Sequence, residues 1–150
     1  MTNARPKLES AALAGAIYAA CVFAIAFVTG ALRTTLLATF RALEPVWAVA
    51  IELPAILAAA WLACGWALSI GSVPATRTAR VMMGLVAFFL IVAAEAMLTG
   101  AVTGNGLAGV AASYTRPEVL LGLAGQLVFA TFPLIRRPNY LSTRFHASDG

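Results

Sequence analysis

The sequence contains very little charge. Only 11% of its 150 residues are Asp, Glu, Lys or Arg, whereas a soluble domain carries roughly 25%. A surface that faces water cannot be built from so few charges, and 61% of the residues are apolar. The shortage of charge excludes an ordinary soluble domain and indicates that lipid surrounds most of the chain.

Residues that bind metals are also scarce. The single histidine, His146, lies beyond the last apolar run, and Cys21 and Cys64 lie inside apolar runs, far from any partner motif. A cysteine in such a place behaves as a small hydrophobic residue. We therefore expect no metal site, no disulfide and no bound cofactor.

The sequence shows no motif for covalent chemistry. No serine–histidine pair, metal cluster or phosphate-binding loop accompanies its acidic residues, so we expect no catalytic residues and no enzymatic activity. The ten Lys and Arg residues stand between the apolar runs rather than in one dense patch. That distribution argues against a nucleic-acid partner and is typical of a protein oriented in a bilayer.

Four apolar runs exceed the roughly 20 residues that cross a bilayer. They predict one all-α transmembrane domain over residues 1–150, a four-helix bundle with short loops. The predicted helices cover residues 10–41, 44–70, 78–102 and 117–135, followed by a mobile tail over 138–150. The first run is too long for a signal peptide, whose apolar core has about 7–15 residues. Segment 104–113 is too short to span and is expected in the outer interface.

The basic residues predict the orientation. The N-terminus, the second loop and the tail together hold seven of the ten Lys and Arg residues. Because basic flanks stay on the cytoplasmic side, we expect both termini in the cytoplasm (N-in/C-in). The expected location is a bacterial-type inner, or plasma, membrane.

Four polar side chains interrupt the predicted spans: Arg33, Glu52, Glu95 and Gln126. A charge at the centre of a membrane helix costs at least about 2.5 kcal/mol, so such residues are expected to face partners or water. Counted at 1.5 Å per residue, all four lie about 12 Å below the outer helix ends. The sequence therefore predicts one buried polar layer in the outer third of the bundle.

Small residues share the helix faces of this layer. Gly15 and Gly30 lie on the stripe of Arg33, Gly84 on that of Glu95, and Gly122 on that of Gln126. Small residues mark faces where membrane helices approach closely. We therefore expect these faces to pack together, with a dry seam of small residues in the cytoplasmic half.

The layer holds one guanidinium and two carboxyl groups. Arg33 can form a fork with one carboxylate or bridge both. One cation cannot neutralise two anions, so we expect one glutamate, Glu95 rather than Glu52, to carry a proton at neutral pH.

Two further features are candidate sites. Pro54 removes one hydrogen bond of its helix and predicts a kink beside Glu52. Arg136, Arg137 and Tyr140 form a basic and aromatic group that suits contact with an anionic lipid head, although an ordinary basic anchor has the same composition.

The sequence leaves several functions open. The leading hypothesis is an inner-membrane accessory or interaction subunit without enzymatic activity, associated with itself or with a larger membrane complex. Its polar layer then locks the helices in register. The alternative is a small proton-coupled transporter, dimeric, that uses Glu52 and Glu95. A binding site for a lipid, quinone or pigment is the third possibility.

Overall fold

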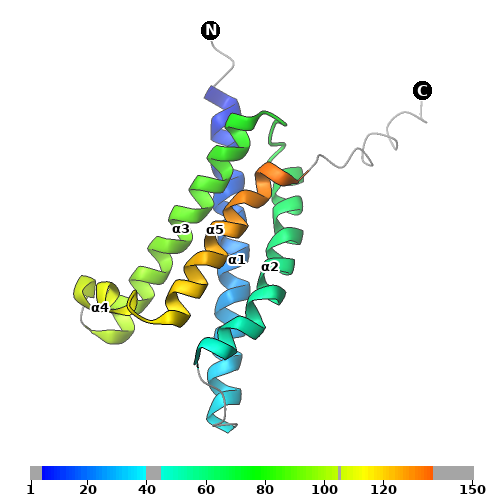
Figure 1. Cartoon of the computed structure of the whole chain (residues 1–150). Helices are drawn as coiled ribbons and strands as arrows, with labels where there is room; N and C mark the ends of the chain where they lie inside the picture. Colours follow the sequence, from blue (N-terminus) through cyan, green and yellow to red (C-terminus); the bar gives the residue numbers. More distant parts are fainter. Residues whose placement is uncertain (1–4, 40–44, 105, 137–150) are drawn as a thin grey trace, which may run out of the picture.

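A computed structural model of the chain describes residues 5–39, 45–104 and 106–136. Over these ranges it contains α1 (Arg5–Thr39), α2 (Pro45–Ile70), α3 (Arg77–Thr103), α4 (Gly106–Ser113) and α5 (Pro117–Ile135), drawn in Figure 1. All but the short α4 are long and apolar enough to cross a bilayer. The prediction of an all-helical protein with four such helices is confirmed.

The helix ends differ little from the prediction, except in α1. The observed α2, α3 and α5 begin and end within one residue of the predicted bounds, but α1 already includes Arg5 rather than beginning at residue 10. Its described part ends at Thr39, and the predicted end at residue 41 lies outside the described residues. Its polar first turn continues the helix because Arg, Lys and Glu are good helix formers. The predicted tail over 138–150 lies outside the described residues.

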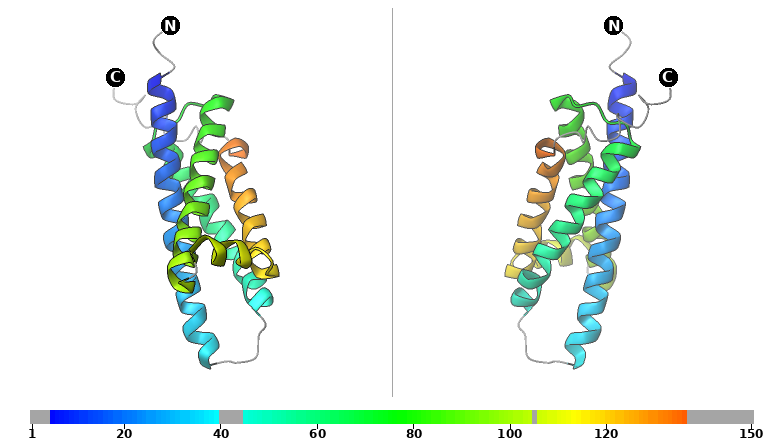
Figure 2. Two further views of the ribbon diagram at one scale, coloured as in Figure 1. Left: turned by 90° about the vertical axis from the view of Figure 1, so that its left-hand side faces the viewer. Right: turned by 90° about the vertical axis from the view of Figure 1, so that its right-hand side faces the viewer.

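The long helices form a ring. In that ring α1 packs against α2 and α3, and α5 packs against the same two helices, so that α1 and α5 are diagonal partners. Figures 1 and 2 show that α1 begins at the same end of the bundle as α5 finishes. We call this the terminal end, and the opposite end the cavity end. At the cavity end, α4 lies against α3 and across the direction of the long helices (Figure 2).

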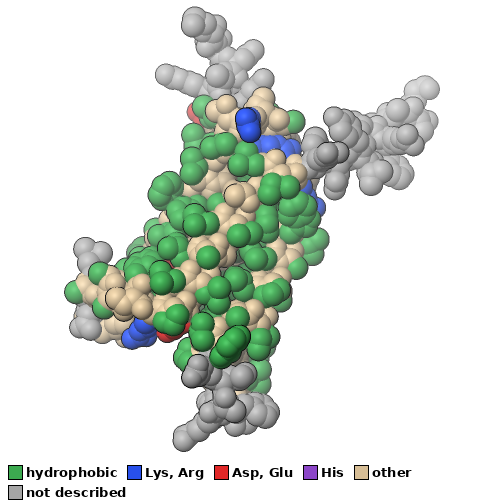
Figure 3. All heavy atoms as spheres, viewed as in Figure 1, with side chains coloured by type: hydrophobic (Ala, Val, Ile, Leu, Met, Phe, Trp, Pro, Cys, Tyr) green, Lys and Arg blue, Asp and Glu red, His purple; other side chains and the backbone are tan. Residues whose placement is uncertain are grey.

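Large apolar side chains cover much of the outer surface. Exposed examples are Phe27 on α1, Leu62 on α2, Phe89 and Met97 on α3, and Leu127 on α5. Figure 3 shows hydrophobic side chains over the middle of one face, with Lys and Arg side chains toward the two ends. An apolar surface of this extent is unfavourable in water and suits the hydrocarbon of a bilayer.

Small residues bring the helices into close contact near the core. A Cβ atom at Gly15 would lie 2.7 Å from the Met83 carbonyl oxygen, so only glycine fits where α1 crosses α3. A Cβ atom at Gly84 would likewise overlap the carbonyl oxygen of Ala130, where α3 crosses α5. Close backbone approach at small residues is how membrane helices gain packing energy.

The C-terminal part of α5 is held by side chains of two other helices. Pro133 lies inside α5 and has no N–H, which leaves the Phe129 carbonyl without its helical donor. The buried Tyr18 hydroxyl of α1 donates to that carbonyl at 3.1 Å. Arg80 of α3, only 7% exposed, donates to the Pro133 carbonyl at 2.7 Å and also to the Arg136 carbonyl. A cation on these last carbonyls stabilises the negative end of the helix dipole.

Candidate functional site

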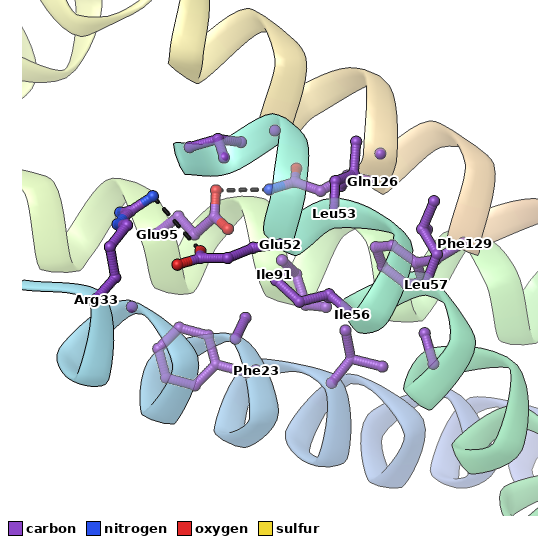
Figure 4. Close-up of a pocket in the computed structure, with 17 residues that line it drawn as sticks. Phe23, Arg33, Glu52, Leu53, Ile56, Leu57, Ile91, Glu95, Gln126 and Phe129 are labelled. Carbon is purple, nitrogen blue, oxygen red and sulfur yellow. Dashed lines mark hydrogen bonds and ion pairs between the residues drawn. The ribbon is translucent and has the colours of Figure 1, made fainter. Parts of the chain in front are cut away.

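A cavity lies inside the ring, in the half of the bundle toward the cavity end. Its volume is about 170 Å³, and residues of α1, α2, α3 and α5 line it (Figure 4). The four polar residues singled out from the sequence, Arg33, Glu52, Glu95 and Gln126, all lie in its wall. They stand six to nine residues from the near ends of their helices, which is a depth of roughly 9–14 Å.

The first pair in the wall joins α1 to α2. An Arg33 Nη1 atom lies 3.5 Å from Glu52 Oε2, and the two side chains are 29% and 25% exposed. One contact at this distance is a single ion pair rather than a two-pronged fork. The described residues show no second contact from Arg33 to Glu95, so the bridging arrangement considered above is absent from them.

The second pair joins α3 to α5. The Gln126 Nε2 atom donates to Glu95 Oε2 at 2.5 Å. Gln126 is 8% exposed, and its Oε1 atom has no hydrogen-bond partner among the residues that the structure describes. In Figure 4 the carboxyl groups of Glu52 and Glu95 lie between the Arg33 guanidinium and the Gln126 amide. The wall therefore presents one ion pair, one carboxyl group without a cationic partner among these four, and one free acceptor.

The polar layer is less buried than the sequence suggested. Gln126 is buried, Arg33 and Glu52 are half-buried, and Glu95 is exposed. The difference arises because the helices do not close around these side chains: they surround a cavity that leaves the Glu95 side chain accessible. The expectation of a uniformly buried layer is therefore wrong.

Two glycines show why the cavity exists. A Cβ atom at Gly30 or Gly122 would meet no other atom within 4 Å, and both residues line the cavity. The sequence had placed them on close packing faces, as it had Gly15 and Gly84. The expectation of close packing is confirmed for Gly15 and Gly84 and is wrong for Gly30 and Gly122. A small residue allows close approach, but it leaves empty space where the neighbouring helix lies farther away.

Apolar side chains form the rest of the wall. Leu53 and Leu57 of α2 face Phe23 of α1, Ile91 of α3 and Phe129 of α5 around the space (Figure 4). Each of these five apolar residues lies farther from the cavity end than the polar residue of its own helix, although Val49 of α2 lies on the other side of Glu52. The cavity is thus amphipathic, with one polar part and one apolar part.

Pro54 lies within an uninterrupted α2, next to the cavity residue Leu53. The first turns of α2 lean away from the line of its later turns in Figure 1, as expected of a helix with an internal proline. The bend turns the segment that carries Glu52 relative to the rest of the helix.

The basic group at the end of α5 has protein partners. The Arg136 guanidinium lies 5.0 Å from the centre of the Trp61 ring and donates to the Trp61 carbonyl. It also lies against Gly65, whose lack of a side chain makes room for it. Arg137 and Tyr140, the other two candidates for contact with an anionic lipid, lie outside the described residues. Of the three, Arg136 is therefore engaged with α2 rather than free for a lipid head.

A second hollow lies at the terminal end. It has a volume of about 550 Å³, and Arg77, Arg80 and Arg136 are among its lining residues. Guanidinium groups in such a place match the phosphate of a lipid head. Arg80 and Arg136, however, already donate to backbone carbonyls, so the lipid-contact hypothesis stays a prediction.

Sequence reasoning missed two functional positions in the bundle, Tyr18 and Arg80. The sequence gives only indirect evidence for the role of Tyr18. Pro133 shows that the Phe129 carbonyl lacks its helical donor, but it does not show which helix supplies another donor. In the sequence, Arg80 was interpreted as an ordinary basic residue of the second loop. Its side chain is in fact buried and donates to the carbonyls at the end of α5.

Comparison with protein-family models, with curated proteins and with solved structures finds no match to this chain. The function is therefore argued from the geometry of the site.

Proposed function

We propose that the chain is a small membrane transporter that binds a small solute in the cavity and couples its movement to a proton through Glu95. The observation that carries this proposal is the amphipathic cavity, in whose wall the Gln126 Oε1 atom has no hydrogen-bond partner among the described residues. A polar layer that only locked helices in register would be packed tightly and fully hydrogen-bonded, since a partly satisfied layer costs stability.

The charges in the wall support coupling to protons. Glu52 has Arg33 as its counter-ion at 3.5 Å, whereas Glu95 has only the neutral Gln126 amide at 2.5 Å. The charged groups that face Glu95 across the cavity are therefore Arg33 of α1 and Glu52 of α2. A carboxylate in excess of the available cations is expensive in a membrane. Either a proton or a bound solute neutralises it, and exchange between the two couples them.

The proposed orientation places the terminal end in the cytoplasm of a bacterial-type inner membrane. Arg77, Arg80 and Arg136 lie at that end, and basic flanks stay on the cytoplasmic side. The cavity then belongs to the outer half of the bilayer.

Because four helices rarely enclose a complete pathway, we further propose that two copies form the working unit. Association with a larger membrane complex, as an accessory subunit, stays a prediction about partners.

The test uses purified protein in liposomes that contain a pH-sensitive dye. Benzamidinium, benzamide and benzenesulfonate are added outside in turn, since they match the cavity in size. At least one of the three is expected to change the internal pH in wild-type liposomes and in Glu118→Gln, but not in Glu95→Gln. Glu118 is a matched control because it lies on α5, in its first turn, and does not line the cavity.

Two outcomes would contradict the proposal. Folded wild-type protein that moves protons with none of the three solutes would exclude proton-coupled transport of solutes of this size. Equal activity in Glu95→Gln and wild type would exclude Glu95 as the coupling group. Thermal unfolding of each variant in detergent verifies that a lost signal does not reflect a lost fold.

A further inference from the structure

The geometry points to a substrate class for this cavity: a small monovalent organic cation that carries N–H donors on a compact apolar body. Primary ammonium and amidinium compounds belong to this class. The inference rests on the proposed function and adds the charge, the hydrogen-bonding pattern and the size of the solute.

The charge follows from the groups in the wall. With both carboxyl groups ionised, Arg33, Glu52 and Glu95 carry one positive and two negative charges, and they are the charged residues among the described lining residues. One monovalent cation brings this wall to neutrality. An anion would face two carboxylates, and a neutral solute would leave the excess charge of Glu95 uncompensated in a low dielectric.

The hydrogen-bonding pattern requires a donor. Gln126 Nε2 already donates to Glu95 Oε2 at 2.5 Å, which orients the amide and leaves Gln126 Oε1 as a buried acceptor without a partner among the described residues. Glu95 retains acceptor capacity as well, because each carboxylate oxygen has two lone pairs. A group with two or more N–H bonds on one cation can donate to the carboxylate and to the amide oxygen together.

The size and lining select the body of the solute. The cavity volume of about 170 Å³ is close to that of an engineered apolar cavity of roughly 150 Å³ that accepts benzene. The apolar part of the wall, from Leu53 and Leu57 to Ile91 and Phe129, would contact one aromatic ring or a short branched chain. A long alkyl chain exceeds this volume.

The experiment compares three solutes of nearly equal size that differ in charge. Wild-type protein in lipid nanodiscs is titrated with benzamidinium, benzamide and benzenesulfonate, and binding is followed by saturation-transfer NMR with displacement titrations. We expect benzamidinium to bind about tenfold more tightly than benzamide, the factor that separates charge-assisted from neutral hydrogen bonds. Benzenesulfonate is expected to bind too weakly to measure.

Two variants locate the binding. Gly122→Leu puts a larger side chain into the cavity wall at a position where an added Cβ atom meets nothing within 4 Å, and it should abolish benzamidinium binding. Glu95→Gln keeps the shape and removes the charge, so it should remove the preference for benzamidinium over benzamide. Glu118→Gln, on α5 outside the cavity wall, should bind all three solutes as wild type does.

The outcomes separate this inference from the proposed function. Tighter binding of benzamide or benzenesulfonate that Gly122→Leu abolishes would overturn the cation assignment and leave a solute-binding cavity in place. Benzamidinium binding that survives Gly122→Leu would overturn the site. Folded wild-type protein that binds none of the three would overturn both proposals together.

Discussion

The substitution of alanine for two glycines on α1 tests the central distinction between close packing and cavity. Gly15 and Gly30 lie on one helix, and Gly→Ala adds one methyl group at each. At Gly15 that methyl would lie 2.7 Å from the Met83 carbonyl oxygen and 3.0 Å from the Val86 Cβ atom. At Gly30 it would meet nothing within 4 Å. Gly15→Ala should therefore destabilise the protein relative to Gly30→Ala.

The magnitude follows from the contacts at Gly15. The methyl group needs α1 and α3 to move apart locally, because a backbone oxygen cannot rotate away, and such overpacking costs about 1–3 kcal/mol. Alanine also favours the helix over glycine by about 0.8–1.0 kcal/mol. That gain applies to both variants and cancels in their difference. The two variants should thus differ by about 1–3 kcal/mol in the free energy of unfolding, with Gly30→Ala at least as stable as wild type.

The assay is reversible unfolding of purified protein in mixed micelles titrated with SDS, followed by tryptophan fluorescence. All three tryptophans lie on α2, so neither substitution changes the helix that carries the fluorophores. Equal stability of the two variants would refute the close crossing of α1 and α3 at Gly15. A marked loss of stability in Gly30→Ala would refute the open space at Gly30.

The same assay checks two other contacts. Arg33→Met leaves the Glu52 carboxylate without its ion-pair partner. It should destabilise the protein more than the double variant with Met at both positions, because an unpaired charge costs more than the absence of the whole pair. A larger loss of stability in the double variant would contradict the ion pair. Tyr18→Phe removes the donor to the Phe129 carbonyl that Pro133 leaves free. It should cost roughly 0.6 kcal/mol, the average for such bonds between membrane helices, and no more than about 1.7 kcal/mol. Unchanged stability would show that this carbonyl has another donor.

The helices themselves could be predicted because the bilayer allows few alternatives. A chain in hydrocarbon must satisfy its backbone polar groups within each segment, so an apolar run of about 20 residues becomes a helix. Pro45 and Pro117 mark two helix starts, where a missing N–H costs nothing. Pro54 and Pro133, in contrast, lie inside continuous helices, and sequence reasoning treated only the first of them.

The candidate site was predictable in part. Residue type and depth singled out Arg33, Glu52, Glu95 and Gln126, because polar groups are costly in lipid and therefore stand out in an apolar run. Their pairing was not predictable. Alanine is so frequent in the chain that almost any face of each helix contains small residues, so the stripes did not define which helices meet.

The sequence alone is enough to identify four helices that are long and apolar enough to cross a membrane, and the four polar residues among them. Both follow from the free energy of transferring each segment to lipid, which depends on local composition alone. The arrangement of the helices in space shows what the sequence does not: α1 lies diagonal to α5. It also shows that Gln126 donates to Glu95 while Arg33 pairs with Glu52. Finally, it shows that Gly30 borders a cavity whereas Gly15 borders a helix. These choices depend on how the shapes of different helices fit together, and no single segment carries that information.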